Sequence, residues 1–129
     1  MLKTLVPSTI APPNGLYSHG VVVPPNARWV FTAGQVGVKS DGTLLEGFAA
    51  QHEQAWHNAL AVLAAGGMGP GDIVRINVYS TDPSGLAVAR EQRKQFLKPG
   101  HVPASTWVIV KELANPAWLV EVEMVAAKA

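Results

Sequence analysis

The sequence predicts a single α+β domain, a mixed β-sheet with two helices packed on one face. Strand-like and helix-like segments follow one another in the order β-β-β-α-β-α-β-β. Residues 48–65 and 83–97 have the periodicity of helices rather than strands. The chain has 129 residues, 48% of them hydrophobic, which is enough for one compact core and marginal for two. We therefore assign residues 1–129 to one domain.

The first half of the chain predicts three strands. We expect a short strand over residues 2–6 and a second over residues 18–23. The run Pro24-Pro25-Asn26 predicts a turn after the second strand. Residues 29–33 are rich in β-forming side chains, and we expect them to form a hairpin with residues 18–23.

The two helices are predicted from their spacing and their ends. In residues 48–65, apolar side chains recur at the spacing i, i+3, i+4 and i+7, which forms one helix face. These positions are Trp56, Ala59, Leu60 and Leu63. Gly66-Gly67 then predicts the end of the helix. In residues 83–97, Pro83 suits the first turn and Pro99-Gly100 follows the end.

Three further strands complete the predicted sheet, at residues 72–79, 106–110 and 119–126. Two helices can cover only one face of such a sheet, and the chain has no spare element for the other. We therefore expect copies of the chain to associate through the uncovered face.

Composition excludes several classes of protein. The formal net charge is +1, and the basic residues form no stripe of the kind that binds nucleic acid. The chain has no cysteine, which excludes disulfides, thiolate zinc sites and a cysteine nucleophile. Its four histidines form no metal-binding pattern, so we expect them at surfaces or interfaces. No nucleotide-binding loop occurs, and we expect neither a cofactor nor a metal.

The sequence also predicts a cytoplasmic protein. Its longest apolar run, residues 60–65, is far too short to span a bilayer. The first residues have no long apolar stretch and no small-residue cleavage site, so we expect no signal peptide.

Four short segments together resemble one known family. They are Gly15-Leu16-Tyr17-Ser18, Thr32-Ala33-Gly34-Gln35, Pro103-Ala104-Ser105-Thr106 and Val120-Glu121-Val122-Glu123. With the order of elements, they resemble the reactive intermediate deaminase (Rid, YjgF-like) family over residues 11–127. The resemblance implies a chorismate-mutase-like α+β fold, a homotrimer with small-molecule sites in the clefts between subunits, and hydrolysis of imines and enamines without a cofactor.

Ser105 is the main departure from that family. Typical members read Pro-Ala-Arg-Ser where this chain reads Pro-Ala-Ser-Thr, and their arginine binds the substrate carboxylate. A guanidinium binds a carboxylate through two parallel hydrogen bonds, whereas a serine offers one hydroxyl. Losing such a contact costs roughly 1.5–3 kcal/mol of binding if nothing replaces it. We therefore expect a substrate other than 2-aminoacrylate.

Glu121 and Glu123 alternate with valines, which places both carboxylates on one strand face, about 7 Å apart. Such a pair can raise the pKa of one carboxyl and provide an acid or base. A solvated strand face has the same pattern. The resemblance implies that Glu121 orients the hydrolytic water, that Tyr17 lines the cleft and that Gly34 contributes backbone contacts.

Trp107 and Arg90 complete the candidate ligand site. Trp107 shares a strand face with Ser105 and either offers a platform for a flat ligand or packs in the core. Arg90 and Arg93 are three residues apart and share a helix face. Arg90 stands where typical family members have an asparagine near the cleft, so either arginine could replace the missing anion anchor. A solvated helix face is the alternative.

Two functions follow from these residues. The first is hydrolysis of an imine or enamine, with Glu121 and Tyr17 as catalytic residues and Gly34, Ser105, Trp107 and Arg90 as substrate-binding residues. The alternative is a non-catalytic relative that binds a small metabolite. RNA cleavage is disfavoured by the balanced charge and by the absence of a histidine-based acid–base pair.

Overall fold

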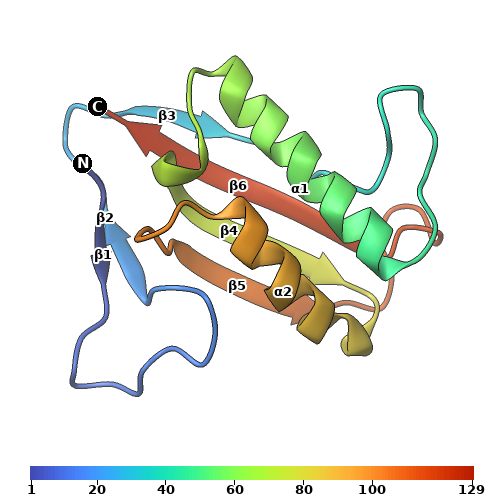
Figure 1. The fold of residues 1–129 in the computed structure, drawn as a ribbon, viewed down its shortest axis with the longest axis horizontal. Coiled ribbons are helices and arrows are strands. Elements are labelled where there is room, and N and C mark those ends of the chain that lie inside the picture. Colours follow the sequence, from blue (N-terminus) through green and yellow to red (C-terminus); the bar gives the residue numbers. More distant parts are fainter.

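A computed structural model describes residues 1–129, and its elements follow the predicted order. Two helices lie side by side on one face of a four-stranded sheet, and a separate two-stranded ribbon holds the N-terminus (Figure 1). The strands are β1 (Lys3–Leu5), β2 (Gly20–Val22), β3 (Arg28–Phe31), β4 (Ile73–Ser80), β5 (Ala104–Ile109) and β6 (Val120–Lys128). The helices are α1 (Phe48–Ala65) and α2 (Leu86–Phe96), with short 3-10 turns at Pro70–Asp72 and Pro83–Gly85.

The four-stranded sheet has the order β3-β6-β4-β5. β4 pairs with β6 in the antiparallel sense and with β5 in the parallel sense, so the sheet is mixed as predicted. Buried and half-buried residues alternate along β6, because every second side chain points to the core side.

The predicted hairpin between residues 18–23 and 29–33 is wrong. β2 pairs with β1, and β3 pairs instead with the distant β6, with Trp29 opposite Ala127. Pro24 and Pro25 have no backbone N–H to donate to a ladder at the end of such a hairpin. β6 offers β3 a long, largely buried partner, and Val30 of β3 packs against Gly66 at the end of α1. Long-range burial therefore prevails over proximity in the sequence.

The helix boundaries follow the predicted signals. α1 covers the predicted residues 48–65, and Gly67 follows it with a φ of 75°, a conformation that favours glycine. The start of the second helix differs, because Pro83–Gly85 form a 3-10 turn before α2 begins. Asp82 caps this turn by accepting a 2.9 Å hydrogen bond from the Ser84 backbone N–H.

The core lies between the helices and the sheet. Its largest fully buried side chains come from α1, β4 and β6, and they include Trp56, Leu63, Ile73, Ile76, Val122 and Met124. The helices therefore cover one face of the sheet and bury it. None of the helices is long and apolar enough to cross a membrane.

The opposite face of the sheet has no cover within the chain. Trp29 and Phe31 on β3 stack with ring centroids 6.1 Å apart, yet they remain 48% and 70% exposed. Beside them lie polar side chains of β4 and β6, Asn77, Tyr79 and Glu123, which hydrogen bond to one another. We refer to this surface as the open face.

Candidate functional site

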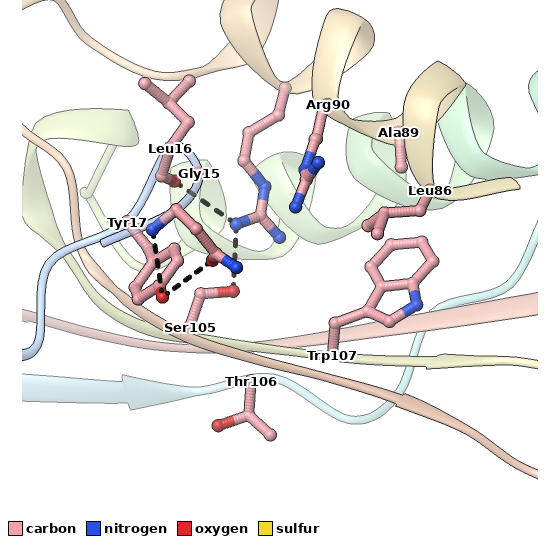
Figure 2. A pocket seen from close by; sticks show the side chains of 11 residues that line it. Gly15, Leu16, Tyr17, Leu86, Ala89, Arg90, Ser105, Thr106 and Trp107 are labelled. Carbon is pink, nitrogen blue, oxygen red and sulfur yellow. Dashed lines mark hydrogen bonds between the residues drawn. The ribbon is translucent and has the colours of Figure 1, made fainter. Parts of the chain in front are cut away.

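A cavity of about 360 Å³ lies between α2, β5 and the loop that precedes β2 (Figure 2). Residues 14–17 of the loop, residues 105–107 of β5 and four side chains of α2 line it. Tyr17, Arg90, Ser105 and Trp107, all predicted site residues, are among them.

The loop is held against the start of β5 by hydrogen bonds at Ser18. Its backbone N–H donates to the Pro103 carbonyl at 3.0 Å, and its hydroxyl donates to the Val102 carbonyl. This contact brings Tyr17 beside Ser105 although the two are far apart in the sequence. The Tyr17 hydroxyl donates a 3.1 Å hydrogen bond to Asn14 Oδ1 at the mouth of the cavity.

The guanidinium of Arg93 is buried next to the Ser105 side chain. Its side chain comes from α2, and the residue is only 8% exposed. Nη1 donates to Ser105 Oγ at 2.9 Å and to the Leu16 carbonyl at 3.4 Å. Cζ lies 5.8 Å from the centroid of the Trp56 ring, within the range of a cation–π contact.

No carboxylate pairs with this guanidinium. The ion pairs of the structure join Glu53 to His57 and Glu91 to Lys94, and no acidic residue lines the cavity. Burial, with a smaller effect from Arg90, lowers the pKa of Arg93 to about 10, so the group stays charged at neutral pH. A buried cation whose hydrogen-bond partners are all neutral is an attractive site for an anion.

Arg90 lines the same cavity one helical turn earlier and is exposed. Figure 2 shows its side chain extending from α2 toward the space between Ser105 and Trp107. Its Nε lies close to Gly15, within 3.6 Å of the position that a Cβ would take there. Arg90 also forms no ion pair. The guanidinium groups of Arg90 and Arg93 therefore line one cavity, and neither has an acidic partner.

Trp107 packs in the core, one of its two predicted roles, whereas its use as a platform for a flat ligand stays a prediction. Its ring packs on Phe48 and His52, with centroids 6.3 Å from each, and it also lines the cavity. It therefore forms an apolar wall that the core holds in place.

His52 corrects the expectation that the histidines lie at surfaces or interfaces. It is fully buried, next to the Trp107 ring. Its Nε2 accepts a 3.2 Å hydrogen bond from Trp56 Nε1, and its Nδ1 lies 2.6 Å from Gln92 Oε1. These contacts require a proton on Nδ1 alone, and burial lowers the pKa of His52 to about 4. The neutral ring thus links α1 to the helix that carries Arg93.

Glu121 and Gly34 lie together on the open face, outside the cavity. A Cβ at Gly34 would clash with the Glu121 carboxylate, so the glycine permits their close approach. Burial and, to a lesser degree, Glu123 raise the pKa of Glu121. Glu123 in turn accepts hydrogen bonds from Tyr79 at 2.7 Å and Asn77 at 3.1 Å.

The predicted residues therefore form two groups within one chain. β4 separates β5 from β6, and Ser105 points to the helix side whereas Glu121 points to the open face. The cavity offers two guanidinium groups, and the open face offers a carboxylate of raised pKa. A single chain does not join them.

The chain is thus an α+β domain in which two helices cover one face of the sheet, and a cavity lined by two arginines lies at the edge strand β5. The family described as Endoribonuclease L-PSP matches residues 8–128. The chain belongs to this family, that of the Rid or YjgF-like proteins.

Individual relatives agree. A RutC family protein of Aquifex aeolicus is 36% identical over 118 residues, which cover 90% of this chain and 91% of the relative. A 2-iminobutanoate/2-iminopropanoate deaminase of Salmonella typhimurium is 28% identical and covers 99% of both chains. The crystal structure of YyfB, a Rid family protein of unknown function from Yersinia pestis, superposes with a TM-score of 0.89 at 30% identity and covers 98% of both chains.

Proposed function

We propose that this protein is a Rid-like deaminase that hydrolyses imines carrying a carboxylate, and that Arg93 binds that carboxylate. The observation that carries the proposal is the buried Arg93 guanidinium at Ser105, which has no acidic partner. The relatives named as 2-iminobutanoate/2-iminopropanoate deaminases act on compounds in which a carboxylate adjoins the imine carbon, and this chemistry suits the cavity.

The reaction needs a positioned water and a proton transfer. The water oxygen bonds to the imine carbon, the nitrogen takes up a proton, and the resulting carbinolamine loses ammonia and leaves a carbonyl group. Glu121 suits the task of orienting the water, because its raised pKa makes it a better proton acceptor than an ordinary carboxylate. Tyr17, at the cavity mouth, supplies a hydroxyl.

Glu121 reaches the cavity in this proposal through a homotrimer. The open face of one copy covers that of its neighbours, and each Glu121 meets the cavity of an adjacent copy. Two observations support this arrangement, the exposed stacked pair Trp29–Phe31 and the separation of the two groups within one chain.

The preferred substrate in this proposal is larger than 2-aminoacrylate. The Arg93 guanidinium enters from α2, so it holds a carboxylate on the helix side of the cavity rather than on the strand. A substrate with a side chain can fill the remaining space against Trp107, whereas 2-aminoacrylate has too few atoms to contact both.

The test is ammonia release above the spontaneous rate, with imines generated in solution from different amino acids. We expect faster turnover of 2-iminobutanoate than of 2-aminoacrylate. Arg93→Gln should lower kcat/KM by about 10- to 150-fold, the equivalent of 1.5–3 kcal/mol. Lys94→Gln, on the same helix but outside the cavity, is the matched control. Wild-type turnover that favours 2-aminoacrylate would contradict the substrate assignment.

The alternative, a metabolite-binding protein without turnover, makes a different prediction in the same experiment. The cavity lies within one chain and needs no Glu121 to hold a ligand. Binding that depends on Arg93, with no ammonia release from any imine, would favour this alternative.

A further inference from the structure

The cavity contains one more cation than a single carboxylate needs. Arg93 alone can bind a carboxylate through its two-pronged guanidinium. Arg90 adds a second guanidinium to the same lining, and neither group has an acidic partner. The charge of Arg90 also contributes, less than burial does, to the lowered pKa of Arg93.

One face of α2 explains this arrangement. Leu86, Ala89, Arg90 and Arg93 stand at i, i+3, i+4 and i+7, and all four line the cavity. Arg93 is buried at the inner end, and Arg90 is exposed at the mouth. Leu86 lies over Trp107 in Figure 2, so the cavity also has an apolar part beside the two guanidinium groups, against which a short carbon chain can pack.

We propose that the ligand has two anionic groups, and that it is a 2-imino acid with a second carboxylate at the far end of a short carbon chain. In this arrangement Arg93 binds the carboxylate beside the imine carbon, and Arg90 binds the terminal carboxylate at the cavity mouth. The inference rests on the proposed function, since it names the substrate class of the same site.

The size of the cavity agrees with such a ligand. Its volume of about 360 Å³ lies at the lower end of the range for small-molecule pockets, roughly 300–1,000 Å³. A metabolite of a few carbon atoms fits this range better than a nucleotide or a peptide.

The test measures binding rather than turnover, with two stable 2-oxo acids of equal carbon number. 2-Oxoglutarate has a terminal carboxylate, whereas 2-oxopentanoate ends in a methyl group. Calorimetric titration at low ionic strength should give wild-type protein an affinity about 5- to 20-fold higher for 2-oxoglutarate. Added salt should reduce that preference.

Substitution separates the two arginines. Arg90→Gln should abolish the preference for 2-oxoglutarate, whereas Arg93→Gln should weaken the binding of both acids. Because Arg90 is exposed, the variant should keep the wild-type melting temperature. Equal wild-type affinities, no binding of either acid, or an Arg90→Gln variant that retains the preference would overturn the inference.

The outcome also distinguishes this inference from the proposed function. A preference for 2-oxoglutarate without any imine hydrolysis would support the two-anion site and contradict the deaminase. Efficient hydrolysis of imines with one carboxylate, without preference for a second, would support the deaminase and contradict the two-anion site.

Discussion

Arg93 of α2 donates a 2.9 Å hydrogen bond to Ser105 of β5. Ser105 is the residue that replaces the arginine expected from the Rid resemblance, so a guanidinium remains at this point of the site but comes from a different element. The serine becomes the acceptor that holds it, together with the Leu16 carbonyl.

Introducing an arginine at position 105 should therefore destabilise the protein. Ser105→Arg would place a second guanidinium against a buried one, and like charges in a poorly solvated site repel strongly. We expect a loss of about 1–3 kcal/mol in the free energy of unfolding, measured by urea denaturation.

The double variant Ser105→Arg with Arg93→Gln provides the control. It removes the repulsion and should recover most of the lost stability. Equal stabilities of the wild type and the Ser105→Arg variant would show that the two side chains do not compete for one place.

Stability should depend on pH through His52. Its pKa in the folded protein, about 4, is below its ordinary value of 6.5, so the unfolded chain binds a proton more readily. The free energy of unfolding therefore has its full value, as far as His52 is concerned, above pH 6.5, and it decreases as the pH falls toward 4. The decrease in the free energy of unfolding due to His52 is about 3 kcal/mol.

Denaturation between pH 4 and 7 would measure this dependence. His52→Gln should flatten the curve over that interval, whereas His57→Gln, an exposed position on the same helix, should leave it unchanged. An identical slope for wild type and His52→Gln would contradict the buried neutral ring.

Glu121→Gln should separate turnover from binding. The amide keeps the shape of the side chain but does not accept a proton, and general acid–base groups contribute about 100-fold or more. We expect kcat to fall by about that factor in the ammonia-release assay. The affinity for 2-oxo acids should change far less than kcat, because in the proposal Arg93, and not Glu121, binds the carboxylate. An unchanged kcat would remove Glu121 from the mechanism.

Charges on the open face should dissociate the proposed trimer. Trp29→Glu with Phe31→Glu would place carboxylates in the exposed stacked pair, at little cost to a single chain. Light scattering should show particles of three 13.6 kDa chains for the wild type and of one chain for the variant.

Val88→Glu is the matched control for this experiment, because Val88 is an exposed apolar residue of α2 away from the open face. It should leave the assembly intact. A wild type that remains monomeric at micromolar concentration would contradict the trimer.

Much of the fold could be predicted from the sequence, because its signals are local. The apolar spacing in residues 48–65 and the glycines that follow define α1 to the residue. The partner of β3 could not be predicted, because it depends on which distant strand offers the better burial. The predicted hairpin pairs β3 with β2, the strand that precedes it in the sequence, and this prediction is wrong.

In the candidate site, too, local spacing could be predicted from the sequence and long-range contacts could not. Sequence spacing placed Arg90 and Arg93 on one helix face, but the rotation of α2 over the sheet decides which of them reaches Ser105. The apolar residues Leu86 and Ala89 mark the side of α2 that faces the sheet, and Arg93 follows them on that side. This spacing could have indicated that Arg93, rather than Arg90, is buried. Likewise, His52 stands one turn before Trp56 on the apolar face of α1. The contact between Gly34 and Glu121 needs the pairing of distant segments.

Binding of a simple monocarboxylate to the wild type and to Arg93→Gln shows whether Arg93 is the carboxylate-binding residue. We would titrate 2-oxobutanoate into the wild type and the variant at pH 7 and confirm by melting temperature that both are folded. The titration measures the dissociation constant of the carboxylate and does not require turnover. We predict that the dissociation constant rises by about 10- to 150-fold in the variant. Equal dissociation constants for folded wild type and folded Arg93→Gln would contradict the account.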